Sequence, residues 1–273
     1  MRPKFSYLDT EAFYDAEDAF YRSFWDNEGS LHWGVFDDQT GPDFLKACAN
    51  LNKIMAAKAC VDSRSTVLDL GCGNGAVAAW LCQALSCQVT GIDLSGVRIE
   101  NANERRRRQP LEVRNRLDFA KASATDLPYP DGSFSHVWSQ AAIYHVHHKE
   151  KALEEAHRVL IPGGKFVFDD LIKPKSEISQ EAQTHVYDRL LFDTNFSFQS
   201  YQRALADTGF KVLEAHDLSE HLKTSYECLA GITEKRIGGP GTEKYRDITV
   251  VYQKMAEAVK RSELGWGLYV CEK

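Results

Sequence analysis

The sequence lacks long hydrophobic runs, a basic surplus and paired cysteines. No apolar stretch approaches the length of about 18 residues that a membrane-spanning helix requires, and the N-terminal residues lack the apolar core of a secretory signal. The formal net charge of the 273 residues is -6, whereas proteins that bind nucleic acid usually carry a basic surplus. We therefore expect no membrane span and no nucleic-acid partner.

The seven cysteines are scattered and odd in number, which argues against a disulfide framework. None forms a Cys-x-x-Cys pair or has metal-ligand spacing with a histidine, so we interpret them as reduced thiols in a cytoplasmic protein. The neighbouring histidines His145, His147 and His148 also lack a Cys or Asp partner at ligand spacing, and we expect no metal site.

What the sequence does have is a glycine-rich loop after an apolar run. Residues 66–75 read Thr-Val-Leu-Asp-Leu-Gly-Cys-Gly-Asn-Gly, in which Asp69 precedes glycines at every second position. Glycine is required where the backbone turns sharply or where a ligand approaches it closely. A strand that ends in such a loop and leads into a helix forms a nucleotide-binding crevice. The loop alone does not identify the nucleotide, because Gly71-x-Gly73-x-x-Ala76 also matches a dinucleotide-binding pattern.

Strands and helices alternate around this loop. The apolar patterning predicts strands at 66–70, 88–93, 117–122, 134–139 and 165–170, and helices at 76–86, 96–108 and 149–160. This order predicts a parallel sheet with helices on both faces. From residue 173 the alternation ends, and we predict a helix around 180–192, a helix at 199–208, and strands at 210–216 and 266–271. We expect a single α/β domain over residues 1–273.

Three segments are expected to cover the crevice at the carboxyl ends of the strands, where ligands bind in open α/β sheets. They are residues 1–42, residues 173–198, and the mostly helical residues 219–263. The first segment is rich in aromatic residues, which fits a helix packed on the domain and a lid over the ligand equally well.

Three motifs follow one another along the chain. They are the glycine loop at 69–75, the segment Leu-Pro-Tyr-Pro-Asp-Gly-Ser-Phe at 127–134, and the segment His-Arg-Val-Leu-Ile-Pro-Gly-Gly at 157–164. Through these motifs, residues 60–172 resemble the class I S-adenosylmethionine-dependent methyltransferases. The resemblance implies a Rossmann-like seven-stranded sheet of order 3-2-1-4-5-7-6 with strand 7 antiparallel. It also implies S-adenosyl-L-methionine as cofactor and S-adenosyl-L-homocysteine as product.

The resemblance implies roles for residues at the ends of the first three strands. Asp69 lies near the amino group of the cofactor's methionine part, and Asp93 accepts hydrogen bonds from the ribose. Leu94 packs on the adenine, and Ser123 stands where many members carry an acid that binds the adenine amino group. The cofactor residues implied are Asp69, Gly71, Cys72, Gly73, Asp93, Leu94, Ser123, Ala124, Ser139 and Gln140.

A narrower resemblance concerns the methyl acceptor. The stretch Trp-Ser-Gln-x-Ala-x-x-His at 138–145 and the segment Leu-His-Trp-Gly-Val-Phe-Asp-Asp at 31–38 are similar to sarcosine/dimethylglycine N-methyltransferases. Members of that group often have an acid where this chain has Ala141. This resemblance implies a small amine as acceptor, either sarcosine- or dimethylglycine-like or phosphoethanolamine-like.

The acceptor site is expected to contain a proton acceptor, because an ammonium group must lose its proton before it can be methylated. We predict Tyr144 and His145 as catalytic residues. The residues predicted to bind the acceptor are Tyr21, Trp33, Gln140 and Tyr144. A carboxylate on the acceptor would require an arginine, and the candidates are Arg22, Arg189 and Arg203.

Two other functions remain open at this point. A C-methyltransferase acting on a sterol or terpenoid alkene would need an apolar, aromatic pocket, which the aromatic N-terminal segment also fits. An NAD-dependent oxidoreductase would use the same glycine loop, although the motifs at 127–134 and 157–164 argue against it. The sequence does not predict the oligomeric state.

Overall fold

The computed structural model describes residues 5–191 and 196–273. Small parts of the predicted covering segments 1–42 and 173–198, and the last residue of the helix predicted at 180–192, therefore lie outside the described residues. Within them, no helix is both long and apolar enough to cross a membrane.

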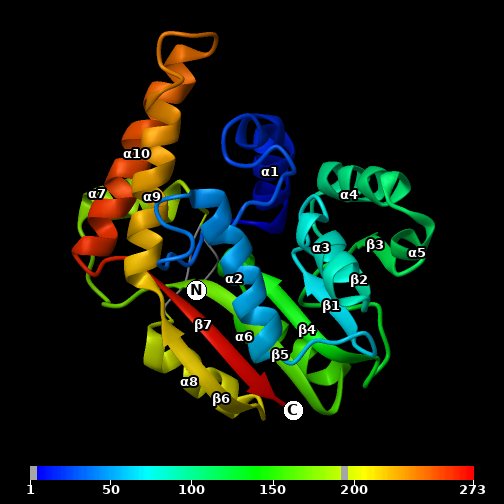
Figure 1. The fold of residues 1–273 in the computed structure, drawn as a ribbon. Helices are drawn as coiled ribbons and strands as arrows, with labels where there is room; N and C mark the ends of the chain where they lie inside the picture. The colour runs from blue at the N-terminus through cyan, green and yellow to red at the C-terminus, as the bar shows by residue number, and fades with distance from the viewer. Residues whose placement is uncertain (1–4, 192–195) are drawn as a thin grey trace.

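The core is one seven-stranded sheet of order β3-β2-β1-β4-β5-β7-β6 (Figure 1). Strand β7 runs antiparallel to both of its neighbours, and the other pairs are parallel. The strands are β1 (Thr66–Leu70), β2 (Gln88–Asp93), β3 (Leu117–Lys121), β4 (Phe134–Gln140), β5 (Leu160–Ile172), β6 (Lys211–Asp217) and β7 (Gly265–Glu272). The predicted fold and strand order are confirmed.

Helices flank this sheet because each has one apolar face to bury. They are α2 (Phe44–Lys58), α3 (Ala76–Leu85), α4 (Gly96–Arg108), α5 (Leu111–Arg114), α6 (Lys149–Val159) and α8 (Phe198–Asp207). A short 3-10 turn, η1 (Ile143–His145), follows β4 directly.

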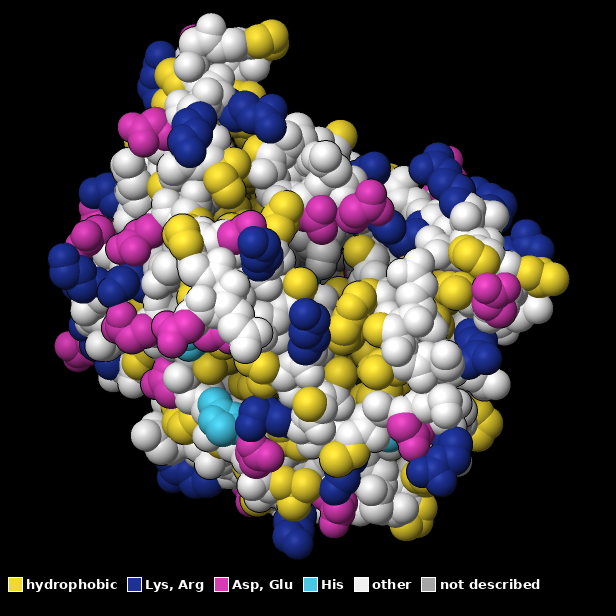
Figure 2. All heavy atoms as spheres, in the orientation of Figure 1, with side chains coloured by type: hydrophobic (Ala, Val, Ile, Leu, Met, Phe, Trp, Pro, Cys, Tyr) yellow, Lys and Arg dark blue, Asp and Glu magenta, His cyan; other side chains and the backbone are white. Residues whose placement is uncertain are grey.

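Further helices lie beyond the carboxyl ends of the strands. Helix α1 (Tyr7–Arg22) begins with a capping box between Ser6 and Asp9 and lies beside α4. Helices α9 (Ser219–Glu234) and α10 (Thr242–Lys260) form a hairpin that projects from the body of the molecule (Figure 1). Acidic and basic side chains are interspersed over most of the face in Figure 2, and basic side chains gather where α4 ends.

Two predicted elements differ from the structure by more than two residues. The helix predicted at 180–192 is instead a short α7 (Gln180–Ala182) followed by the π-helix η2 (Gln183–Asp188). Strand β5 begins at Leu160 rather than at residue 165, because Leu160 already pairs with Phe134 across an irregularity in β4. The Pro-Gly-Gly segment therefore ends α6 but does not delay the strand.

Candidate active site

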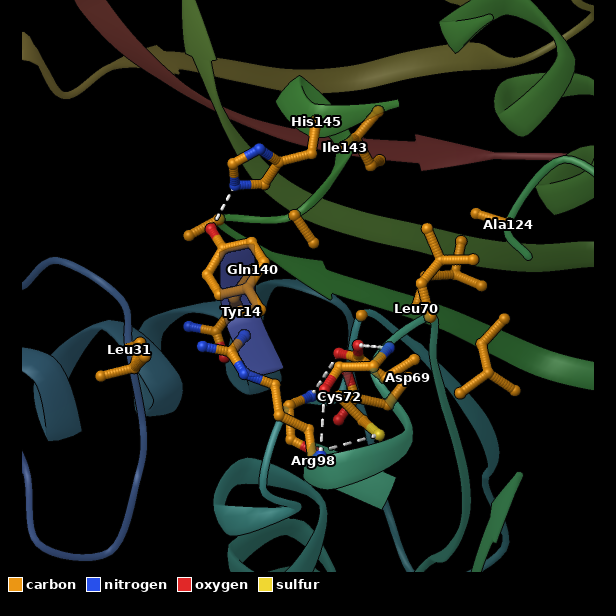
Figure 3. A pocket seen from close by; sticks show the side chains of 18 of the residues that line it. Tyr14, Leu31, Asp69, Leu70, Cys72, Arg98, Ala124, Gln140, Ile143 and His145 are labelled. Carbon is orange, nitrogen blue, oxygen red and sulfur yellow. Dashed lines mark hydrogen bonds between the residues drawn. The ribbon is translucent and has the colours of Figure 1, made fainter. Parts of the chain in front are cut away.

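A cavity opens at the carboxyl ends of β1, β2 and β4, and α1 forms part of its wall (Figure 3). The space within it, open solvent at its mouth included, is about 1120 Å³. Every residue predicted to bind the cofactor lines this cavity, except Ser139. The side chain of Ser139 points away from it, is fully buried, and donates a hydrogen bond to the carbonyl of Leu70 at 2.9 Å.

The glycine loop forms the floor of this cavity. Gly71 has a φ of +76°, and a Cβ added to it would lie only 2.4 Å from the Cβ of Ala142. Gly73 has a φ of +54°, and its N–H donates to the Asp93 carboxylate at 2.9 Å. Position 71 requires glycine for two reasons: the backbone is in the left-handed conformation, and there is no room for a side chain.

Two carboxylates stand at neighbouring strand ends. Asp69 at the end of β1 is 3% exposed, and its Oδ2 atom has no hydrogen-bond partner. Burial, with a smaller contribution from the charge of Asp93, raises the pKa of Asp69 to about 7. Asp93 accepts from the backbone N–H groups of Gly73 and Ser95, which leaves lone pairs on both of its oxygens. A ligand with an ammonium group and ribose hydroxyls fits this pair.

The third strand contributes a less polar wall. Ser123, Ala124 and Leu94, the residues predicted to surround the adenine, line the cavity together. The Ser123 hydroxyl lies 2.8 Å from that of Thr125 and accepts from the Thr125 N–H. This local network holds the hydroxyl in place at the wall.

Gln140 ends β4 and is held on both sides of its amide. Its Oε1 accepts from the indole N–H of Trp138 at 3.0 Å, and its Nε2 donates to Oδ1 of Asn52 in α2 at 3.0 Å. One N–H of the amide remains for a ligand. Asn52 is a buried polar residue that the sequence did not single out, because nothing local indicates that α2 docks here.

His145 lines the same cavity, and its Nε2 is hydrogen-bonded to the hydroxyl of Tyr14 from α1 (Figure 3). Burial, followed by the positive charges of Arg98 and Lys149, holds the pKa of His145 well below its usual range. Burial raises the pKa of Tyr14 to about 12. Both groups are therefore neutral at pH 7, and the tyrosine hydroxyl is able to donate to the imidazole.

A second cavity adjoins the first and shares Tyr14 and Leu31 with it. The predicted acceptor residues Tyr21, Trp33 and Tyr144 line this second cavity, whereas Gln140 lines only the first. Its other walls are largely aromatic and aliphatic side chains of α1, α9 and α10. Tyr144, predicted with His145 as one catalytic pair, thus faces a different cavity, although its hydroxyl lies 3.4 Å from that of Tyr14.

Among the described residues that line the second cavity, Arg189 is the only charged one. It donates to the hydroxyl of Tyr21 at 3.0 Å, and its guanidinium carbon lies 4.9 Å from the centre of the Phe13 ring. Of the other arginines considered for an acceptor carboxylate, Arg22 lies 3.7 Å from Asp18 and Arg203 is exposed on α8. Neither lines either cavity.

The sheet order and the glycine loop with its two strand-end acids define a class I S-adenosylmethionine-dependent methyltransferase. The chain belongs to the S-adenosylmethionine-dependent methyltransferases, and S-adenosylmethionine is its cofactor. The model of the methyltransferase domain matches residues 68–168. This membership sets aside the NAD-dependent alternative.

Several relatives whose names indicate different methyl acceptors are equally similar to this chain in sequence. The chain is 30% identical to a sarcosine/dimethylglycine N-methyltransferase of Halorhodospira halochloris, with 83% of this chain and 80% of that protein covered. It is also 30% identical to a glycine/sarcosine/dimethylglycine N-methyltransferase of Actinopolyspora halophila, where 94% of this chain spans 46% of the longer protein. A (+)-O-methylkolavelool synthase of Herpetosiphon aurantiacus is again 30% identical, with coverage of 85% and 81%.

Solved structures share the fold at low sequence identity. The cyclopropane synthase MmaA2 of Mycobacterium tuberculosis superposes with a TM-score of 0.86 at 16% identity, covering 100% of both chains. The geranyl diphosphate C-methyltransferase of Streptomyces coelicolor, solved with S-adenosyl-L-homocysteine, gives a TM-score of 0.79 at 17% identity, covering 100% of this chain and 99% of that chain. The fold is thus common to enzymes with different acceptors.

Proposed function

We propose that this methyltransferase acts on the nitrogen of a small amine that also carries an anionic group, a carboxylate or a phosphate. The observation that carries the proposal is Arg189, the one cation among the described residues that line the second cavity, whose other described lining residues are aromatic or aliphatic. This cavity adjoins the first one, which is called the cofactor cavity from here on. A planar guanidinium binds carboxylate and phosphate oxygens in pairs. The name of the relative from Halorhodospira halochloris, a sarcosine/dimethylglycine N-methyltransferase, points to the same class of acceptor.

The cofactor cavity has the groups that S-adenosylmethionine requires. Asp69 offers an acidic oxygen for the ammonium group, Asp93 accepts from the ribose hydroxyls, and the wall at Ser123 receives the adenine. When bound there, the cofactor supplies a methyl group on a positively charged sulfur, an electrophile that reacts with a neutral amine.

The residues around the second cavity favour the neutral form of the acceptor. Its described lining residues include no acid that would stabilise an ammonium ion, and an apolar environment lowers the pKa of an amine. Tyr14 lines both cavities, and its hydroxyl contacts His145. The Tyr14 hydroxyl can accept a hydrogen bond from the amine while it donates to Nε2 of His145. Tyr144 stays protonated because burial raises its pKa well above its usual value.

Aromatic faces in the second cavity suit the methylated product. The rings of Trp33 and Tyr226 have centroids 5.9 Å apart, and those of Trp33 and Tyr144 lie 6.2 Å apart. Such surfaces attract a methylated ammonium through cation–π contacts. The same wall favours a second candidate function, C-methylation of a terpenoid alkene, because aromatic faces also stabilise a carbocation.

A comparison of matched acceptors tests the proposal. We expect methyl transfer to sarcosine, dimethylglycine or phosphoethanolamine, detected by mass spectrometry, and none to an uncharged terpenoid alkene. Arg189→Met is expected to raise KM for the anionic acceptor by about 10- to 100-fold, the effect of losing one charged hydrogen bond, and to leave KM for its uncharged ester or amide nearly unchanged.

Arg203→Met serves as the control, since Arg203 is exposed and lines neither cavity. Transfer to the alkene without transfer to any amine would overturn the proposal in favour of C-methylation. Equal effects of the Arg189 and Arg203 substitutions would remove the argument for an anionic acceptor.

A further inference from the structure

The cofactor cavity contains a buried cation that the sequence did not indicate. Arg98 is the third residue of α4, its side chain is 9% exposed, and it is the only lysine or arginine among the described residues that line this cavity. Its Nε and Nη2 atoms have no hydrogen-bond partner. A buried guanidinium that lacks hydrogen bonds is costly unless a ligand supplies them.

The nearest acid leaves that capacity unused. Nε of Arg98 lies 3.6 Å from Oδ1 of Asp18, an ion pair that is too long for a hydrogen bond. Asp18 already accepts from the side-chain amides of Asn74 at 2.8 Å and Asn101 at 3.1 Å, and it lies 3.7 Å from Arg22. Asp18 thus balances part of the charge of Arg98 without satisfying its donors.

The orientation of the guanidinium is set by Tyr14. The guanidinium carbon of Arg98 lies 3.9 Å from the centre of the Tyr14 ring (Figure 3). The ring therefore covers one face of the guanidinium and leaves the edges of the guanidinium free. One edge lies beside the glycine loop, since a Cβ added to Gly73 would be 4.0 Å from Nη1 of Arg98. Arg98 therefore reaches the glycine loop at 69–75, to which Asp69 also belongs.

We propose that Arg98 binds the carboxylate of the cofactor's amino acid moiety. That moiety carries a carboxylate and an ammonium group on one carbon atom. The cavity is lined by a buried cation with unused donors, Arg98, and by a buried acid with an unused oxygen, Asp69. The two charges of the ligand therefore meet two opposite charges of the protein, and each satisfies atoms that otherwise lack partners.

A different role for Arg98 makes a different prediction. Arg98 contacts Tyr14 and Asp18, both on α1, and through them it fastens α1 over the cavity. If Arg98 did only this, its loss would weaken the binding of every ligand that α1 covers by the same factor. If Arg98 contacts the carboxylate, its loss instead weakens the binding of only those ligands that possess the carboxylate.

Calorimetric titration with two ligands separates these roles. S-adenosyl-L-homocysteine contains the amino acid moiety, and 5′-methylthioadenosine lacks it. For Arg98→Met we expect the Kd of S-adenosyl-L-homocysteine to rise by about 10- to 100-fold and that of 5′-methylthioadenosine to change by less than about threefold. The control is Arg105→Met on the same helix, because Arg105 fastens the loop after α1 through Glu28 but does not line the cavity.

Arg105→Met is expected to change the Kd of both ligands by the same factor. Equal weakening of both ligands by Arg98→Met, or no weakening of either, would overturn the proposal. A second measurement uses the wild-type protein and thus does not depend on how the variant folds. It compares S-adenosyl-L-homocysteine with its decarboxylated analogue, and equal affinities for these two ligands would also overturn the proposal.

Discussion

The hydroxyl of Tyr14 is hydrogen-bonded to Nε2 of His145, which lies 131 residues further along the chain. The two rings meet edge to face with centroids 5.0 Å apart. This contact joins α1 to the turn after β4, so the N-terminal helix contributes a polar group to the site as well as a wall. It also places a hydroxyl on the boundary between the cofactor cavity and the second cavity.

Tyr14→Phe is expected to lower the rate of methyl transfer without affecting cofactor binding. The substitution removes the hydroxyl but keeps the ring on which Arg98 stacks. If this hydroxyl, oriented by His145, holds the amine in place, kcat should fall by about 100-fold, and adding His145→Gln should cause little further loss because the two act as one unit. Single-turnover kinetics and calorimetry with S-adenosyl-L-homocysteine measure the two effects separately.

Tyr129→Phe is the control for this prediction, since Tyr129 lines neither cavity. Its rate should equal that of the wild type. A Tyr14→Phe variant that is as active as Tyr129→Phe would mean that the hydroxyl has no part in the reaction.

The sheet and the cofactor loop could be predicted because their signals are local. The loop at 69–75 lies within one strand, turn and helix, and its spacing alone requires the backbone that the structure shows. Tyr14, Asn52 and Arg98 could not be predicted, because their positions depend on how α1, α2 and α4 dock. No pattern in a single sequence reports that docking.

The residues that follow β4 show a second limit. Ser139 and Gln140 are neighbours at the end of the strand, yet alternation sends the Ser139 side chain to Leu70 and Gln140 to the cavity. Tyr144 and His145 are likewise adjacent but face different cavities, because the chain turns through η1. The sequence indicated that this segment lies at the site, but it could not assign each side chain to one cavity or the other.

Gly71→Ala should destabilise the protein far more than Gly163→Ala. Both glycines have a φ of +76°, but a Cβ at Gly71 would lie 2.4 Å from Ala142 whereas one at Gly163 has no neighbour within 4 Å. The left-handed conformation costs about 1–2 kcal/mol in each variant, and the clash adds about 1–3 kcal/mol at Gly71 alone. Urea unfolding measures both, and equal losses would show that the loop moves to accommodate the methyl group.

Asp69→Asn should stabilise the cofactor-free protein at pH 8 but not at pH 4. Burial raises the pKa of Asp69 from 3.8 to about 7, so the folded state favours the protonated acid. That contribution to stability is complete below pH 3.8 and is lost as the pH rises toward 7. Asparagine cannot ionise, so the variant should gain on the order of 4 kcal/mol at pH 8, as measured by unfolding at both pH values.

The same substitution should weaken S-adenosyl-L-homocysteine binding, because asparagine offers no charge to the ammonium group. In the wild type, affinity should fall as the pH drops below 7, by at most about tenfold per pH unit. An affinity that is independent of pH between 5 and 8 would mean that Asp69 does not face the ammonium group.

Helix α1 should behave as a lid that the cofactor closes. Polar contacts attach it to the cofactor-binding elements, among them Asp18 with Asn74 of the glycine loop and Asp15 with Ser95. Such contacts separate at lower cost than an apolar core, so S-adenosyl-L-homocysteine should slow trypsin cleavage after Arg22, and Asp18→Ala should speed it. Cleavage after Arg236, exposed at the tip of the α9–α10 hairpin, is the internal control and should not respond to the ligand. If S-adenosyl-L-homocysteine protects neither site or both equally, α1 is a fixed wall of the cavity and the cofactor enters by another path.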